Sequence, residues 1–440
     1  MTPQPQGAPT EQTARVTVRS QVSTALAGLP RRAITRSGGL TIGTGVARLG
    51  TLAGAVIVAR TLGRADLGRY AAAVAIGAIV VSGPGSGLPI MAIRDVAARR
   101  RGRKFMIRAI RAELAVTAVA TCFAVIISTA IMGRNALAAE LGLSSGLGNM
   151  ILTLLNLAEC IGLGLQLHRV VIFLQVGLGF AVPALTLLAL RAGLGVVGAV
   201  GALAAASLPL TILGFWALRK PIRCAPDELD TRRLLWRSKS FLGLAAVNGG
   251  YQRVDAVVLL AVAGATPTGI YASAYRLLGP FDLMAAGFAQ AFLPLFSSLK
   301  PGTPRWVDVR RRAMRLYSLA VMPVLIVATV FMPILLVTVF GSSFRSAVTP
   351  ARILMLSVLP STLYWPDALV LVALERETVV LYAFLLSTLL DVLLVVTFAA
   401  RLGAAGAAWA WVAAELSLWF ALTLVLHRGD MVPPSRTHTA

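Results

Sequence analysis

Long apolar runs dominate this chain and decide the solvent in which it can fold. They recur from residue 37 to residue 426, with short polar segments between them. As an α-helix, a run of about 20 apolar residues is as long as the hydrocarbon core of a bilayer is thick. The composition agrees, with 57% hydrophobic residues, 13% charged residues and a mean hydropathy of +0.79. The sequence therefore predicts an all-α, polytopic membrane protein rather than a soluble globule.

We expect about twelve transmembrane helices from the length and spacing of these runs. The divisions near Arg169 and Arg191 depend on only one or two polar residues. The expected spans lie at about 37–59, 70–93, 112–133, 145–166, 170–190, 194–217, 241–263, 270–296, 316–339, 350–372, 379–399 and 403–426.

The sequence also repeats itself. The segment LGRADLGRYAAAVAI around Gly63 matches AGATPTGIYASAYRL around Gly264, about 201 residues later, and a weaker match pairs Leu194 with Leu402, about 208 residues later. Six spans in each half give both halves the same orientation. We therefore expect two lobes related by a pseudo-twofold axis along the membrane normal, with the substrate site between them.

This division predicts five segments. They are a basic N-terminal tail (1–36), an N-terminal six-helix lobe (37–217), a basic linker (218–240), a C-terminal six-helix lobe (241–426) and a short C-terminal tail (427–440).

The basic residues predict the topology. The net charge of +23 would suggest nucleic acid binding in a soluble protein, but here most Lys and Arg residues lie in loops between apolar runs, so we expect no nucleic-acid partner. If the spans alternate, about 30 Lys and Arg residues fall on one side and about 7 on the other, and the positive-inside rule assigns the richer side to the cytoplasm. Both tails and the linker are then cytoplasmic.

The N-terminal tail permits two interpretations. Val18, Val22, Leu26 and Leu29 recur at helical spacing among arginines, which suits a helix lying on anionic lipids of the inner leaflet. A disordered basic tail explains the same composition equally well. No long apolar run precedes Ser37, so a cleavable signal peptide is not expected.

Ionisable residues inside the expected spans are the best candidates for a functional site, because each costs roughly 2.5 to 3.5 kcal/mol at mid-membrane. Arg253 and Asp255 are two residues apart and point to different faces of a helix, so they must find partners elsewhere. The alternative is that such charges only hold helices together. The ionisable residues in the spans are Arg48, Glu159, Arg253, Asp255, Arg276, Asp282, Arg352, Asp367, Asp391 and Glu415.

From this set we derive two groups of candidates. Several cations at membrane depth suit a passing pyrophosphate, which needs charge-assisted donors, so the candidate substrate-binding residues are Arg48, Arg253, Arg276 and Arg352. Arg352 lies near a span end, and the alternative is that it only extends to the interface. The candidate ion-coupling residues are Asp255, Glu159 and Asp282. The scattered cysteines and histidines predict neither a metal site nor a disulfide framework.

The order of several motifs resembles the polysaccharide (O-antigen type) flippases of the multidrug, oligosaccharidyl-lipid and polysaccharide exporter superfamily. The matching residues are Ala59, Arg60, Leu62, Gly63, Gly68, Tyr70, Gly87, Leu88, Pro89 and Arg94 in the first half, and Arg253, Asp255, Gly269, Tyr271, Ala274, Tyr275, Arg276, Pro294, Phe340, Gly341, Phe344, Gly403, Gly406 and Ala407 in the second.

The resemblance implies a transporter of the bacterial plasma membrane that moves an undecaprenyl-pyrophosphate-linked oligosaccharide outward by alternating access. It implies a proton or sodium gradient as the driving force, no cofactor, and a polysaccharide polymerase as a possible partner.

Three alternatives stay open. A multidrug exporter of the same superfamily would favour acidic residues in its cavity, and Glu159, Asp255 and Asp282 permit that interpretation. A lipid II flippase usually has two further helices, for which this chain lacks room. A polytopic sugar polymerase or ligase would need catalytic residues in a sizeable outer loop, whereas every expected outer loop is short, so an enzyme is not expected.

Overall fold

The structure is a computed structural model of the whole chain. It describes residues 31–82, 87–97, 103–219, 250–251, 253–285, 287–288, 303–373 and 376–429. All regular structure within these ranges is helical, without a β-strand, as the sequence predicts. Residues 1–30 and 430–440 of the expected tails, most of the linker 218–240, the first part of the seventh span and the later part of the eighth lie outside the described residues.

The first half of the chain holds the six spans expected there. The first span and the beginning of the second lie in one long helix, α2, which bends at Gly63, where the backbone has φ 83° and ψ −168°. The elements are α2 (Arg31–Gly77), a π-helical turn (Ala78–Ser82), α4 (Gly87–Ala97), α5 (Arg103–Met132), α6 (Ala136–Gly164), α7 (His168–Arg191) and α8 (Gly195–Leu218).

The second half is built from shorter pieces. Its elements are α10 (Val254–Ala263), α11 (Ala265–Tyr275), a 3₁₀ turn (Arg276–Leu278), α13 (Pro304–Val330), α14 (Met332–Phe340), a second 3₁₀ turn (Ser342–Ala347), α15 (Val348–Met355), α16 (Val358–Ala373), α17 (Glu377–Leu402) and α18 (Ala404–Gly429). Each expected span thus coincides with described helix, although the second, seventh and eighth are described only in part.

The helices have the length and surface of membrane spans. Nine helical segments of the described chain are long and apolar enough to cross a bilayer, and α10 is a shorter apolar helix. Large apolar side chains lie fully on the outside, such as Leu319, Phe180 and Phe420. Such surface is stable against lipid but not against water, so the protein is a multi-pass membrane protein.

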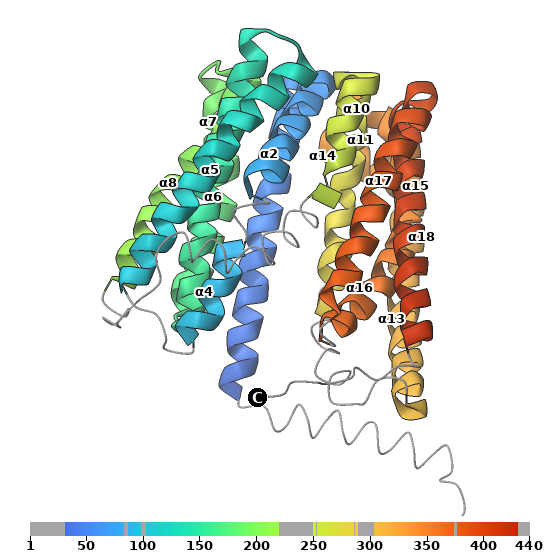
Figure 1. Ribbon diagram of the computed structural model, residues 1–440. Helices are drawn as coiled ribbons and strands as arrows, with labels where there is room; N and C mark the ends of the chain where they lie inside the picture. Colours follow the sequence, from blue (N-terminus) through green and yellow to red (C-terminus); the bar gives the residue numbers. More distant parts are fainter. Residues whose placement is uncertain are drawn as a thin grey trace, which may run out of the picture.

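The helices form two groups that stand side by side (Figure 1). In the first group α2 packs along α7, α5 along α6, and α6 along α8; in the second, α17 packs along α18 and α16 against α18. The two groups meet mainly where α11 packs against α2.

The backbone repeats at the same two offsets as the sequence. A left-handed φ favours glycine, which lacks a Cβ atom, and such glycines occupy equivalent turns of the two halves. The three pairs are Gly63 and Gly264 (φ 83° and 86°), Gly133 and Gly341 (100° and 101°), and Gly195 and Gly403 (56° and 56°). We call the end of the bundle that holds these six turns the outer end, after the predicted topology, and the opposite end the inner end.

The two groups touch closely near the outer end. A Cβ atom on Gly68 of α2 would lie 1.9 Å from the carbonyl oxygen of Ala265, and one on Gly269 of α11 would lie 1.8 Å from that of Arg64. Only glycine permits backbones to approach this closely. Nearby, the Arg60 guanidinium donates to the carbonyl oxygens of Thr338 and Val339, the latter at 2.9 Å, in the last turn of α14. These contacts hold the outer ends of the two groups together.

Candidate functional site

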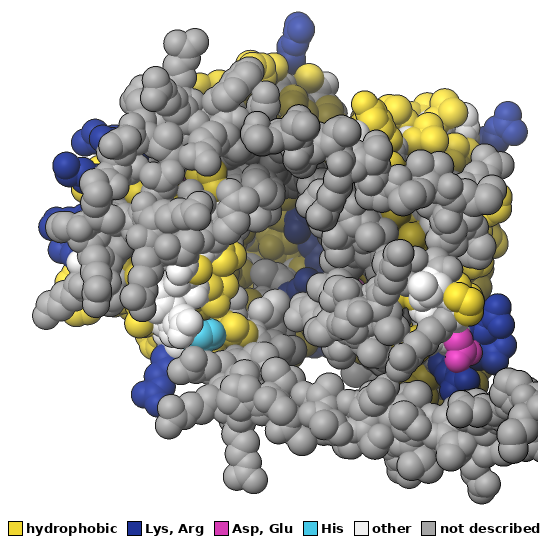
Figure 2. Space-filling model, turned by 60° about the horizontal axis from the view of Figure 1, so that its bottom comes forward, with side chains coloured by type: hydrophobic (Ala, Val, Ile, Leu, Met, Phe, Trp, Pro, Cys, Tyr) yellow, Lys and Arg dark blue, Asp and Glu magenta, His cyan; other side chains and the backbone are white. Residues whose placement is uncertain are grey.

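A hollow opens between the two groups of helices at the inner end. Figure 2 looks toward this end and shows Lys or Arg side chains inside the opening between the two halves. Because the outer ends are in contact, the hollow is open to one side of the membrane. A cavity at this place is where two pseudo-symmetric lobes of a transporter bind their substrate.

Arg253 and Arg276 lie at the same depth of this bundle. Arg253 precedes α10, which ends at the outer turn of Gly264, and Arg276 follows α11, which begins after that turn. At 1.5 Å per residue each arginine is about 16 Å below the turn, which is about half the thickness of the hydrocarbon core. The two guanidinium groups are close enough for their charges to interact.

Tyr70, which belongs to the first half of the chain, lies next to these arginines. The Arg276 guanidinium lies over the Tyr70 ring, 5.7 Å from its centroid, and donates to the Ala272 carbonyl at 3.1 Å. The charge of Arg253 also acts on Tyr70. A cation over an aromatic face is stabilised by the ring quadrupole. Two arginines of one half and a tyrosine of the other therefore form one cationic cluster between the lobes.

The local backbone around Arg253 differs from the sequence-based expectation. We expected Arg253 inside a continuous membrane helix from residue 241 to 263, but it is the residue before the first turn of α10 and has non-helical dihedral angles (φ −143°, ψ −11°). Its side chain is exposed. An interrupted helix is tolerated at membrane depth where it lines a cavity that holds water, so the break agrees with a position on the hollow.

Arg48 and Asp282 bring a second pair of opposite charges toward each other across the two halves, without a direct ion pair. Arg48 is exposed on the inner part of α2, and Asp282 is exposed on the helical segment after the 3₁₀ turn at Arg276. The charge of Arg48 acts on the Asp282 carboxylate. This pair lies further toward the inner end than Arg253 and Arg276, because both residues are more distant along their helices from the outer turns.

Arg352 has a different environment. It is exposed on α15, and its Nε donates to the Thr329 carbonyl of α13 at 3.2 Å. Within the described residues, no contact links it to Arg48, Arg253 or Arg276.

Asp255 lies in a buried group of carboxylates in the second half. It accepts hydrogen bonds from the Tyr271 hydroxyl and, at 2.7 Å, from the Ala256 amide. The charges of Asp255 and Glu415 both act on Asp391 of α17. Glu415 of α18 accepts from the Tyr251 hydroxyl at 3.1 Å. Three buried acidic side chains from α10, α17 and α18 thus lie in one region of the core of the second half.

Asp391 has no hydrogen-bond partner for either carboxylate oxygen among the described residues, and it is completely buried. A buried ionised carboxylate without a partner is very costly, so this position needs a proton or a cation. No group of three or more His, Cys, Asp or Glu side chains in the described part of the chain is arranged to hold a metal ion.

The other two candidate coupling residues lie elsewhere. Glu159 of α6 accepts from Gln175 of α7 at 3.2 Å, and Gln175 also contacts Thr44 of α2 at 3.4 Å, so Glu159 belongs to the first half of the bundle. Asp282 faces Arg48. The three carboxylates that the sequence grouped together therefore occupy three separate places.

Sequence reasoning missed several members of these clusters. Asp391 and Glu415 were recognised as intramembrane acids but were not joined to Asp255, because they lie far away in the sequence. Glu113 was not recognised at all, although it is completely buried in α5. Tyr70 could have been found as a site residue, since the repeat pairs it with Tyr271.

Solved structures of other membrane transporters have a similar fold. An inward-facing multidrug resistance MATE family transporter of the MOP superfamily aligns over 87% of this chain and 94% of its own, with a TM-score of 0.72 and 15% identity. The lipid II flippase MurJ, in an inward closed conformation, aligns over 89% of this chain and 88% of its own, with a TM-score of 0.72 and 14% identity. A MOP superfamily transporter from Pyrococcus furiosus aligns over 92% of this chain and 96% of its own, with a TM-score of 0.58 and 18% identity.

The family of this chain is identified by sequence comparison. No curated protein sequence matches the chain at a significant level. The sequence profile of the family described as "Polysaccharide biosynthesis protein" matches residues 37–300, which are more than half of the chain and contain every member of the cationic cluster. The chain therefore belongs to the polysaccharide biosynthesis protein family and has the fold of the MOP superfamily transporters.

Proposed function

We propose that this protein is a flippase that moves a polyprenyl-pyrophosphate-linked oligosaccharide from the inner to the outer face of the bacterial plasma membrane. The observation that carries the proposal is the cationic cluster of Arg253, Arg276 and Tyr70 at mid-membrane depth on a hollow between the two halves. The family supports a glycan as the cargo, because its description refers to polysaccharide biosynthesis.

The chemistry of the cluster favours an anionic headgroup. Two guanidinium groups that act on each other repel, and the cost is greater at low dielectric than in water. A pyrophosphate between them would replace this repulsion by bidentate, charge-assisted hydrogen bonds. Arg48, nearer to the inner end, would meet the same headgroup on its way in. Arg352 stays a candidate without a described link to the cluster.

Alternating access would open the contact that now closes the outer end. In the present arrangement the Gly68 and Gly269 backbones and the Arg60 contact join the halves there, and the hollow opens at the inner end. Rocking one half against the other about the cluster would expose the headgroup to the outer side. We propose a proton or sodium gradient as the driving force, with Asp255 as the coupling residue because it lies in a buried group of acids near Arg253.

The substitution of the two arginines tests this proposal. Arg253→Lys and Arg276→Lys keep the charge but lose the planar guanidinium group that binds an anion through two hydrogen bonds, so each is expected to reduce translocation. Ala at either position is expected to nearly eliminate translocation. The assay measures the glycan that becomes accessible to an impermeant label outside, together with the amount of protein in the membrane. Arg191→Ala, at the end of α7, is the matched control.

The competing interpretation is that the arginines only hold the helices together. In that case the Ala variants would fail to accumulate, because the helices lose contacts such as that of Arg276 with the Tyr70 ring. Normal transport by a stable double Ala variant would contradict the proposal. Lipid II or cationic drugs as preferred cargo would instead favour the two alternatives that the structural relatives suggest.

A further inference from the structure

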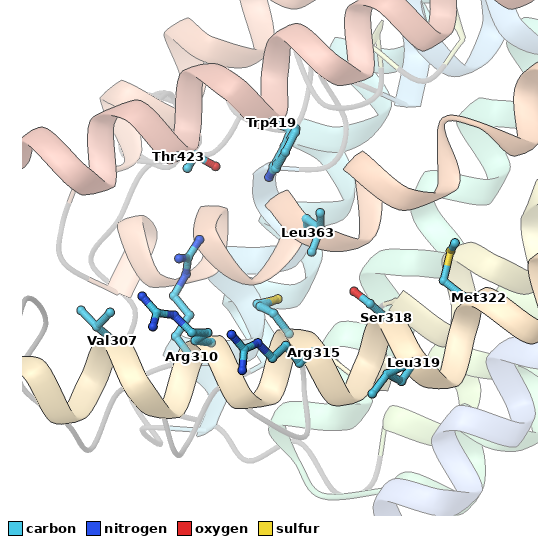
Figure 3. A pocket seen from close by; sticks show the side chains of 11 residues that line it. Val307, Arg310, Arg315, Ser318, Leu319, Met322, Leu363, Trp419 and Thr423 are labelled. Carbon is cyan, nitrogen blue, oxygen red and sulfur yellow. The ribbon is translucent and has the colours of Figure 1, made fainter.

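A groove runs along the lipid-exposed side of the second half, apart from the central hollow. It lies between α13, α16 and α18 and has a volume of about 700 Å³. Figure 3 shows Arg310 and Arg315 toward the Val307 end of the groove and Met322 at its other end, with Trp419 facing them from α18. Leu319 on its rim is 72% exposed, so the groove opens on surface that contacts the acyl chains of the bilayer.

Some of the arginines near the groove are already neutralised. Arg310 forms a bidentate ion pair with the buried Asp367 of α16, with 2.8 Å between Nε and Oδ1. Arg312, on another face of α13, pairs with Asp308 at 2.9 Å. These two pairs contribute no net charge to the groove.

Arg311 and Arg315 are different. Both line the groove and are exposed, and neither has an ion-pair partner among the described residues. They are four residues apart on α13, so their side chains lie on the same face, one turn apart. The described groove lining contains no acidic residue. Within the part of the chain that the structure describes, the groove therefore has two positive charges without an acidic partner at one end and a mainly apolar lining along the rest.

The length of the groove matches one leaflet. From Arg311 to Met322 the helix rises about 16 Å, and half of the hydrocarbon core measures about 15 Å. The arginines lie near the beginning of α13, in the basic segment 300–315 that the positive-inside rule assigns to the cytoplasm. The charged end thus falls at the headgroup level of the inner leaflet.

We propose that this groove is a binding site for one anionic glycerophospholipid of the inner leaflet. Its phosphate accepts hydrogen bonds from Arg311 and Arg315, and one acyl chain lies over Met314, Leu319 and Met322. A zwitterionic lipid binds less tightly because its ammonium group is repelled by the same two arginines. The site is separate from the N-terminal tail and does not depend on which substrate the protein carries.

The experiment uses the full-length protein in detergent and native mass spectrometry with dioleoyl phosphatidylglycerol or dioleoyl phosphatidylcholine. We expect one tightly held phosphatidylglycerol and a weaker phosphatidylcholine. Arg311→Gln combined with Arg315→Gln should weaken phosphatidylglycerol binding about thirtyfold, since each of the two basic residues near anionic lipid contributes about 1 kcal/mol and about 1.4 kcal/mol corresponds to a factor of ten. Arg312→Gln combined with Asp308→Asn removes the neighbouring ion pair and should leave binding unchanged.

A second variant tests the apolar part independently of charge. Ser318→Trp fills the floor of the groove and should also abolish the tight site while keeping both arginines. Equal retention of the two lipids, or equal effects of the test and control variants, would overturn the proposal. So would displacement by millimolar inorganic phosphate, which would indicate a simple anion site, or displacement by a polyprenyl pyrophosphate in preference to phosphatidylglycerol, which would make the groove part of the substrate path.

Discussion

Gly68 and Gly269 make reciprocal contacts across the boundary between the two halves of the protein. A Cβ atom added to Gly68 would lie 1.9 Å from the carbonyl oxygen of Ala265, and one added to Gly269 would lie 1.8 Å from that of Arg64. Gly269 is the repeat equivalent of Gly68, and Ala265 is that of Arg64. A contact in which each partner meets the equivalent of the other is the signature of a twofold interface. The pseudo-twofold axis therefore passes between α2 and α11 near the outer end.

This symmetry predicts similar effects of Gly68→Ala and Gly269→Ala. Each added Cβ atom would collide with backbone, so the helices must separate, at a cost of about 1 to 3 kcal/mol. Both variants should have a lower melting temperature and should react faster with an impermeant maleimide from outside at a cysteine placed at Tyr70, which lies at the boundary between the halves. Gly201→Ala is the control, since nothing lies within 4 Å of its added Cβ. A neutral result for one glycine alone would contradict the symmetric contact.

Arg60 should stabilise the state in which the outer end is closed. Its guanidinium donates to two carbonyls at the end of α14, where the helix dipole also favours a positive charge. A charged hydrogen bond contributes about 1.5 to 3 kcal/mol, so Arg60→Gln should raise the population of the outward-open state by about tenfold or more.

The labelling assay with a cysteine at Tyr70 measures this population. Arg69→Gln is the matched control, because Arg69 lies on the same helix but pairs locally with Asp66 at 2.7 Å. Unchanged labelling in Arg60→Gln would show that the contact does not resist opening.

The charge asymmetry of the loops predicts the orientation in the membrane. A cysteine at Thr266, which is exposed in the first turn of α11, should react with an impermeant reagent added to intact cells. A cysteine at Ser238, which lies outside the described residues, should not react until the membrane is opened. The experiment requires replacement of the three native cysteines. The reverse pattern would place the linker and both termini outside the cytoplasm.

Asp255 and Asp391 should matter for energy coupling. Asp255→Asn and Asp391→Asn each remove one acid from a buried group of three, so transport should lose its dependence on an imposed proton or sodium gradient while the protein stays folded. Proteoliposomes with one gradient at a time measure this and identify the ion. Asp66→Asn, at the outer end, is the control. Full gradient dependence in Asp255→Asn would leave Glu159 and Asp282 as the remaining candidates.

The fold class and most of the helices can be predicted from the amino-acid sequence alone. Apolar runs of bilayer length can only be helical in lipid, because no water is present to satisfy the backbone. The repeat around Gly63 and Gly264 was also visible in the sequence, since a left-handed turn favours the same residue in both halves. The candidate arginines can also be identified from the sequence, because a charged side chain in a membrane span is energetically costly.

The sequence does not predict which charged side chains come together, because that depends on how the helices pack. In the fold, Arg276 lies over Tyr70 of the other half, and Asp255 lies in the same buried region as Asp391 and Glu415. Glu159 and Asp282 lie elsewhere. Helical periodicity determines the direction of a side chain on its own helix but not which helices are neighbours. That choice is made by packing, through close approaches such as Gly68 against Ala265 and through donors such as Arg60, which contact carbonyls more than 270 residues away.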